Sequence, residues 1–439
     1  MRSALWLAAA LWAVSFPLFS TLHTHQVWGT SAAAGYLVAA LVAAVADGRC
    51  GRLFPVMSAL AGAVLVPLLL LVLAGWAQSE VEVIERSGAL LVQQAGPYLT
   101  DPRAVTDYTP YLPAMALLGL PRALLGDGGW ALRLLGDARI WCAAVALLCL
   151  WAGSRVLRRP TGAAHVSAAH ASAAHVSAVA RRQAPGTGPA VLLASPLVAL
   201  PLCVSGVDLL LIGLCGLGLA LATRDRPVAA GLVLAAACAM KWTAWPAAVV
   251  AAALVAGVHG ARPALRCAGA ALVATLALVL PSALLAPGPM AEQVLAFPAG
   301  RGAVATPAAS PLPGHLLAEL GPWGWYTAVG LLLCGGLAVA VSLVVRPPVT
   351  LVAAVDRLAL GLSLAFLLAP AGRFGYFALP FVLVLWARLA DGNRSGPAAA
   401  PAPAGPRPEP RTTGVRRRVP HPATAPRRPS AVPGPEGVR

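Results

Sequence analysis

The sequence predicts an all-α fold, a polytopic bundle of about twelve transmembrane helices with two long extracytoplasmic loops. Of the 439 residues, 59% are hydrophobic and 11% are charged, compared with roughly 25% charged residues in a soluble globular domain. Apolar runs of about 15 to 25 residues, close to the length with which an α-helix crosses a bilayer, recur almost from end to end. This composition excludes an ordinary cytosolic enzyme.

Twelve apolar segments are predicted as spans. They are 4–20, 32–46, 53–77, 138–154, 189–205, 207–222, 228–240, 244–258, 266–286, 325–345, 357–370 and 375–390. If the N-terminus is cytoplasmic, the cytoplasmic side carries 24 of the 32 basic residues and 6 of the 16 acidic residues. Because this asymmetry follows the positive-inside rule, we expect a multi-pass protein of the plasma membrane with both termini in the cytoplasm.

Residues 1–391 are predicted to form the membrane domain. Two segments of low complexity are predicted on the cytoplasmic side, one as a loop within this domain and one after it. Residues 155–188 form a loop with three histidines spaced five residues apart. Five residues advance a helix by about 500°, so these imidazoles do not share a face, and we expect no metal site. Residues 392–439 hold twelve prolines and nine arginines, which predicts a disordered tail whose arginines contact anionic lipid headgroups.

The two longest remaining connections, 78–137 and 287–324, fall on the outer face, where we expect any chemistry because long loops often carry function. The first connection begins AQSEVEVIERSGALLVQQAGPYL, with Glu80 and Glu82 directly after the third predicted span. Carboxylates at a membrane boundary are costly unless they are solvated or paired, which favours a catalytic role. Ser79 and Glu82 also fit the S-x-x-E box that caps a helix, and both interpretations stay open.

Four cationic side chains on the outer face are candidates to bind a phosphate group. Lys241 is the only lysine of the chain and lies in MKWTAWP, between two short apolar segments. Arg373 lies in PAGRFGYF, and its guanidinium group is a natural donor fork for phosphate oxygens. Arg301 and His315 belong to the Pro- and Gly-rich second outer connection. Interfacial anchoring of the first two residues, and an ordinary helix start at His315, are the alternatives.

Three further residues are predicted to line a substrate cavity. Tyr108 and Tyr111 lie in DYTPYLPAMALLGLPRALLG, where prolines interrupt an apolar run, as in a segment held by protein rather than by lipid. Asp208 lies two residues after Gly206, where two short spans turn on the outer side. An aromatic belt at the headgroup level and a helix cap are the alternative roles.

Several motifs are missing from the sequence. It contains no GxxxxGK[ST] loop, no GxGxxG after a strand and no HExxH, so nucleotide-driven transport and zincin chemistry have no support. The net charge of +16 is explained by membrane topology. We therefore expect no cofactor, no metal ion and no nucleic-acid partner.

Four stretches in order, SEVEVIERSGALLVQQAGPYL, DYTPYLPAMALLGLP, MKWTAWP and RFGYFALP, with support from FPAGRGAVATPAASPLPGH, resemble a known family. It is the actinobacterial polyprenol-phosphate-mannose-dependent mannosyltransferase family of the C-type glycosyltransferase superfamily. The resemblance covers roughly residues 30–390. It implies 10 to 13 transmembrane helices, an extracytoplasmic active site, and an acidic base that Glu82 matches best. That position is more usually aspartate in the family, so the assignment stays open between Glu82 and Glu80.

The resemblance implies a polyprenyl-phosphate sugar as donor, with mannose as the sugar, a glycolipid or glycan as acceptor, and membrane lipids as surroundings. Such a transfer needs a base for the acceptor hydroxyl and cations for the departing phosphate. The base would be Glu82 or Glu80, and the cations would be Lys241, Arg373, Arg301 and His315. Direct displacement would invert the anomeric centre. The alternatives are a transporter or flippase for a lipid-linked saccharide, although no internal repeat is visible, and a non-catalytic scaffold.

Overall fold

The structure, a computed structural model, describes residues 2–46, 48, 50–158 and 188–392, and within them every regular element is a helix. In this part of the chain the β contact is an isolated bridge between Ala309 and Gly372. The predicted all-α class is therefore confirmed for the described residues. The three spaced histidines and nearly all of the predicted tail lie outside the described residues.

Eight helical segments of the described chain are long and apolar enough to cross a membrane, which indicates a membrane-embedded protein. They comprise α2 (His23–Val45), α3 (Cys50–Leu60) continued by η1 (Ala61–Leu65) and α4 (Val66–Ala74), α8 (Ala138–Arg158), α15 (Trp245–His259), α16 (Ala261–Leu285), α19 (Pro322–Val345), α20 (Leu351–Leu368) and α21 (Ala378–Gly392). All eight overlap predicted spans.

Four shorter apolar helices accompany these eight segments. They are α1 (Arg2–Phe19), α13 (Val207–Ala222), α14 (Pro227–Cys238) and the run of η3 (Pro113–Gly119) with α6 (Leu120–Leu125). The first three overlap predicted spans, whereas the fourth lies in the predicted first outer loop. Length and hydropathy therefore support eight spans in the described residues, fewer than the twelve predicted.

The predicted span 189–205 is divided into two short helices, α11 (Gly188–Ala194) and α12 (Pro196–Val204). Pro196 lacks a backbone N–H and favours an extended conformation at the residue before it, and Ser195 has φ −67° and ψ 145°. The hydropathy of this stretch predicted a continuous helix. Hydropathy measures only how apolar the residues are, so it does not detect a helix break at a proline.

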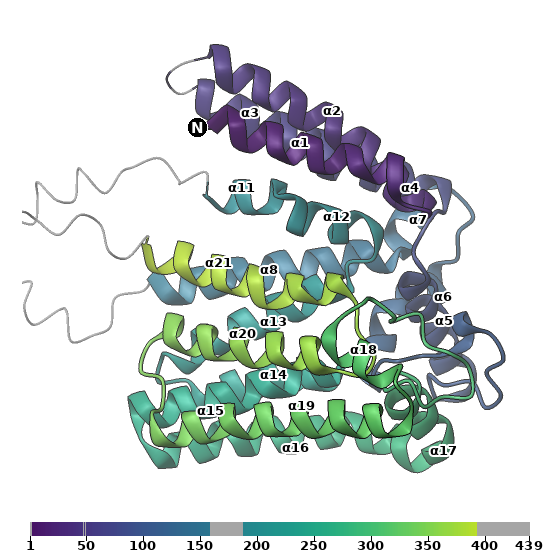
Figure 1. Cartoon of the computed structure of the whole chain (residues 1–439), viewed down its shortest axis with the longest axis vertical. Coiled ribbons are helices and arrows are strands. Elements are labelled where there is room, and N and C mark those ends of the chain that lie inside the picture. Colours follow the sequence, from purple (N-terminus) through teal and green to yellow (C-terminus); the bar gives the residue numbers. More distant parts are fainter. Residues whose placement is uncertain (1, 47, 49, 159–187, 393–439) are drawn as a thin grey trace, which may run out of the picture. The chain divides into compact units, whose positions relative to one another are not determined.

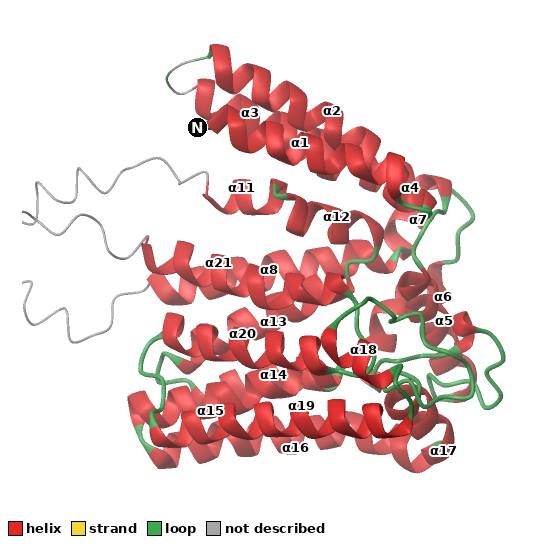
Figure 2. Cartoon of the chain, in the orientation of Figure 1, coloured by secondary structure: helices red, strands yellow, loops and turns green. Residues whose placement is uncertain are grey.

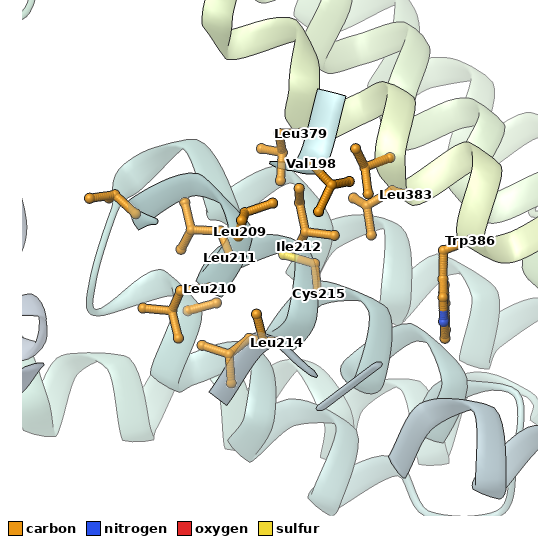
Figure 3. Close-up of a cluster of buried hydrophobic side chains, with 14 of the residues drawn as sticks. Val198, Leu209, Leu210, Leu211, Ile212, Leu214, Cys215, Leu379, Leu383 and Trp386 are labelled. Carbon is orange, nitrogen blue, oxygen red and sulfur yellow. The ribbon is translucent and has the colours of Figure 1, made fainter. Parts of the chain in front are cut away.

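The helix α13 lies at the centre of the packing. Fourteen of its sixteen residues are buried, as expected for a helix that is apolar all round. The helices α8, α20 and α21 pack beside it (Figure 1). Figure 3 shows Val198 of α12, Ile212 of α13 and Leu383 of α21 in one buried cluster. This packing fixes the position of the first turn of α13, which carries Asp208.

The two connections predicted as long loops on the outer face contain short helices, so long loops are not confirmed. The elements are α5 (Ser79–Gln94), η2 (Val105–Asp107) and α7 (Trp130–Gly136) in the first connection, and α17 (Pro287–Met290), η6 (Ala291–Ala296) and α18 (Pro313–Ala318) in the second. The single-turn helices η5 (Trp242–Ala244) and η7 (Phe374–Phe377) lie at the same end. Figure 2 shows that most of the irregular chain gathers around α5 and α18.

A buried ion pair joins three helices at this end of the bundle. Arg139 Nη2 lies 2.7 Å from Asp137 Oδ2, and both side chains are almost fully buried. Arg139 also donates hydrogen bonds to the carbonyl oxygens of Trp76 and Cys203, at 2.9 and 3.0 Å. A buried charge is tolerated only when it is paired and hydrogen-bonded, and here every contact ties the start of α8 to the chain after α4 or to α12.

Candidate functional site

A cavity of about 210 Å³ lies where the connections gather, at the end of the bundle that carries α5. Its lining residues come from the start of α5, the segment around Tyr108, the start of α13, the turn at Lys241, the second connection, and the chain from the end of α20 to η7, with Leu332 of α19. Four charged side chains line it, two carboxylates and two cations, and no other Asp, Glu, Lys, Arg or His is among the described residues of its lining. They are Glu80, Asp208, Lys241 and Arg373. Their formal charges cancel.

Glu80 and Arg373 form the first ion pair of the cavity. Glu80 lies in the first turn of α5, where a carboxylate is favoured by the helix dipole. Arg373 precedes η7 in the turn after α20 and has an extended backbone. Its Nη1 donates to Glu80 Oε1 at 2.6 Å, and both side chains are about a quarter to a third exposed. The pair therefore borders space that a ligand can enter.

Asp208 and Lys241 form the second ion pair, with Lys241 Nζ donating to Asp208 Oδ1 at 2.7 Å. Asp208 lies in the first turn of α13, two residues after Gly206. Gly206 has φ +73°, a left-handed conformation that glycine adopts without strain and that turns the chain from α12 into α13. Lys241 has an extended backbone between α14 and η5, at the tip of the short helical hairpin that the sequence predicted.

Two tyrosine rings surround the ammonium group of Lys241. The Nζ atom lies 5.8 Å from the ring centre of Tyr111 and 5.1 Å from that of Tyr376, within cation–π range. Burial alone lowers the pKa of Lys241, but the charge of Asp208, with Tyr376 and Glu80, raises that pKa above its ordinary value overall. Burial also raises the pKa of Tyr111, and both carboxylates raise it further. At neutral pH Lys241 is therefore charged and Tyr111 is neutral.

The segment 108–114 docks against the Lys241 turn through its backbone. The N–H groups of Leu112 and Ala114 donate to the carbonyl oxygens of Met240 and Ala239, at 2.9 and 3.0 Å. This docking explains how the proline-interrupted run is held by protein rather than by lipid, as the sequence predicted. It also brings Tyr111 to Lys241.

Tyr108 forms another wall of the cavity, with its ring stacked on Phe297 at 4.3 Å. Its buried hydroxyl has no hydrogen-bond partner among the described residues. The hydroxyl of nearby Tyr98, by contrast, donates to the carbonyl oxygen of Tyr111 at 3.0 Å. Buried hydroxyl groups usually have such a partner, so Tyr108 is an exception at the edge of the cavity.

The helix α5, which carries Glu80, is held by a carboxylate that does not line the cavity. Glu85 accepts hydrogen bonds from Arg122 Nε and from the backbone N–H of Ala138, at 3.0 and 3.1 Å. Burial raises the pKa of Glu85 above its ordinary value. Gly88 of α5 also packs directly on Gly119, where a Cβ atom would come within 2.3 Å of backbone carbon. These contacts fix the helical phase that directs Glu80 into the cavity.

Six of the nine predicted site residues line this cavity: Glu80, Lys241, Arg373, Tyr108, Tyr111 and Asp208. The other three lie elsewhere. Glu82 is exposed. Arg301 stacks on the rings of Trp325 and Tyr326, at 4.1 and 5.4 Å from their centres. His315 Nδ1 donates to the carbonyl oxygen of Pro370 at 3.0 Å, and its Nε2 lies 3.3 Å from Glu319.

The capping box expected at the start of α5 is not formed. Gln78 is the cap residue, and no side chain accepts a capping hydrogen bond there. Arg86, the favourable i,i+4 partner of Glu82, instead donates to the carbonyl oxygen of Asp107 at 2.9 Å and to Thr109 at 3.3 Å. The sequence spacing allowed a local ion pair of Glu82 with Arg86. The segment around Thr109 binds the guanidinium group of Arg86 instead.

The structure adds two residues that the sequence did not single out. Tyr376 lines the cavity beside Lys241, and its position three residues after Arg373 in one turn was the available signal. Gln293 is fully buried and links the two outer connections. Its Oε1 accepts from the N–H of Thr109 at 3.0 Å, and its Nε2 donates to Leu99 at 2.6 Å. No local pattern distinguishes such a glutamine.

Comparison with family models, with curated proteins and with solved structures finds no match for this chain. The chemistry of the cavity is therefore argued from its own groups. Among the described residues, no three His, Cys, Asp or Glu side chains lie close enough together to hold a metal ion. Two carboxylates that can accept a proton lie beside two cations that can hold an anion, in a pocket with aromatic walls.

Proposed function

We propose that this chain is a membrane glycosyltransferase that moves a hexose from a polyprenyl-phosphate donor to an acceptor hydroxyl at the extracytoplasmic face. The hexose is mannose by the resemblance of the sequence. The observation that carries the proposal is the cavity in which Glu80, Asp208, Lys241 and Arg373 meet from four distant parts of the chain. A cavity with a proton acceptor beside paired cations suits transfer from a phosphate leaving group.

In the proposed reaction, Glu80 takes the proton of the acceptor hydroxyl while the acceptor oxygen attacks the anomeric carbon. The bond from that carbon to the donor phosphate breaks, and the phosphate leaves with the electron pair. Lys241 and Arg373 stabilise its charge, since both are cations within the same cavity. Asp208 holds Lys241 in place through the 2.7 Å ion pair. One displacement inverts the anomeric centre.

The proposed topology has twelve crossings of the plasma membrane, with α11 and α12 together making one of them. Both termini lie in the cytoplasm. Two features support it. The start of α1 and the end of α21 lie at the end of the bundle opposite α5 (Figure 1). Among the described residues, the cavity end carries eight basic and ten acidic side chains, whereas those at the opposite end include nine arginines and three aspartates, as the positive-inside rule requires of a cytoplasmic face.

The test compares Glu80→Gln with Glu82→Gln in membrane vesicles supplied with a polyprenyl-phosphate sugar. Loss of a general base lowers rates by about 100-fold to 10,000-fold, so E80Q should lose transfer by at least about 100-fold. E82Q changes a carboxylate two residues away that does not line the cavity, so it should transfer sugar at the parent rate. Equal rates for E80Q and the parent would contradict the assignment of the base.

The same vesicles separate transfer from transport. New glycosidic bonds in the parent, with the opposite anomeric configuration to the donor, support the proposed reaction. Movement of the lipid-linked saccharide across the bilayer, without a new bond, would overturn it in favour of a transporter or flippase.

A further inference from the structure

A second cavity, of about 380 Å³, lies between α8, α13 and α21 on one side and α11 and α12 on the other. These helices are in contact along this region, and Figure 1 shows α11 and α12 beside α8 and α21. None of the four charged residues of the catalytic cavity lines it. Its lining is aliphatic and aromatic, apart from Ser154 and Arg158.

The cavity extends along α8. Its lining residues on α8 follow one face of the helix from Ala143 to Arg158. These fifteen steps correspond to a length of about 22 Å at 1.5 Å per residue. The cavity is therefore an elongated, mainly apolar channel, along which an extended hydrocarbon chain can lie.

One end of the channel is polar and basic, and the other end is apolar. Arg158 lines the polar end, is exposed, and takes part in no ion pair between described residues. Arg155, one turn earlier, lies 4.8 Å from the ring centre of Trp151, which also lines the channel. Away from Arg158, the channel is lined by apolar side chains that include Val198, Leu202 and Leu209. An amphiphile with one chain inside and a negative headgroup at the mouth matches this distribution.

We propose that the channel holds one acyl chain of an anionic phospholipid, with its phosphate group beside Arg158. The apolar lining along α8 selects a hydrocarbon chain, and Arg158 at the mouth selects the charge of the headgroup. The site is independent of the glycosyltransferase proposal, because no residue of the catalytic cavity contributes to it. A hydrocarbon chain also fills the gap between α11–α12 and the rest of the bundle, where the broken span leaves incomplete packing.

The test is native mass spectrometry of the full chain reconstituted in vesicles of equal parts phosphatidylglycerol and phosphatidylcholine. The parent should retain one phospholipid, with phosphatidylglycerol in excess. Ala190→Trp places an indole inside the channel, since Ala190 lines it, and should reduce the retained lipid at least tenfold. Val191→Trp is the matched control, because Val191 is the next residue of α11, is exposed and does not line the channel. It should retain lipid as the parent does.

The headgroup is tested separately with Arg158→Gln. This variant should lower the ratio of retained phosphatidylglycerol to phosphatidylcholine by about fivefold, the attraction of one basic side chain for an anionic membrane surface. Arg262→Gln, which removes an exposed arginine from the first turn of α16 and does not line the channel, should leave the ratio unchanged. Any one of three results would overturn the proposal. The parent retains no lipid, the two tryptophan variants retain lipid equally, or R158Q leaves the ratio of phosphatidylglycerol to phosphatidylcholine unchanged.

Discussion

At the scale of single residues, the cavity that Glu80 lines is held by two ion pairs, and in both the acid precedes its cation in the sequence. In one pair the acid, Glu80, precedes its cation by 293 positions, and in the other Asp208 precedes Lys241 by 33. Each cation is already partnered, so a phosphate group that enters must compete with a carboxylate. Burial makes each pairing worth more than an exposed pair, because water screens the charges less.

The pair of Asp208 and Lys241 predicts a pH dependence. The folded pKa of Lys241 is raised, so its protonated form stabilises the fold at neutral pH, and this contribution is lost as the pH rises through that pKa. The variant Asp208→Asn removes the charge that contributes most to raising the pKa of Lys241. Burial, which lowers that pKa, is then opposed less. We expect the alkaline limb of a plot of transfer rate against pH to move to lower pH. Adding Lys241→Arg should abolish that shift, since arginine stays charged. An unmoved limb in D208N would show that the charge of Lys241 is not needed for transfer.

The choice between Glu80 and Glu82 marks the limit of prediction at this scale. Both follow the third predicted span, and the sequence predicted that a carboxylate at this place belongs to a site; Glu80 lines the cavity, whereas Glu82 does not. Residues two apart on a helix point about 200° apart, so one of them must face away from any cavity that the other faces. The helical phase of α5 decides which one, and that phase depends on Gly88 against Gly119, a contact across 31 positions.

At the scale of elements, the contact of α5 with η3 positions Glu80 and predicts an effect on stability. A Cβ atom at Gly88 would lie 2.3 Å from the carbonyl carbon of Gly119, so the helices must separate in Gly88→Ala. We expect a loss of about 1–3 kcal/mol in unfolding free energy, the usual effect of overpacking. Transfer should also fall, since a displacement of about 1 Å at a catalytic group can lower the rate about 100-fold.

The matched control is Gly330→Ala, in the middle of an apolar helix. A Cβ atom at Gly330 would meet no atom within 4 Å, so stability should change by less than about 1 kcal/mol. Thermal unfolding in detergent and the vesicle transfer assay measure both effects. If G88A is as stable and active as G330A, the close approach does not position Glu80.

Elements with a strong apolar pattern were predictable, and elements that depend on distant partners were not. All eight long apolar segments overlap predicted spans, because about 20 apolar residues are sufficient to define a crossing helix. The helices α5, α7 and α18 in the outer connections have weaker patterns and are held by contacts such as Glu85 with Arg122 and the bridge of Ala309 with Gly372. Such contacts form between segments far apart in the sequence, so no local pattern reveals them.

At the scale of the whole membrane domain, the distribution of charge supports one orientation. The cavity end carries all ten acidic residues of the outer connections and turns, with eight basic residues. The described side chains at the other end include nine arginines and three aspartates. Basic residues are retained on the cytoplasmic side during insertion, so the cavity should open to the extracytoplasmic face.

Labelling of introduced cysteines tests this orientation in intact cells. Gly128 lies between α6 and α7 at the cavity end, and Val349 lies between α19 and α20 at the other end; both are exposed. A membrane-impermeant maleimide should label Gly128→Cys in intact cells and Val349→Cys after permeabilisation. The parent gives the background: of the seven cysteines whose side chains the structure describes, five are buried, and the exposed Cys334 lies within an apolar helix. The reverse pattern would place Glu80 and Lys241 on the cytoplasmic side, where an acceptor outside the cell could not reach them.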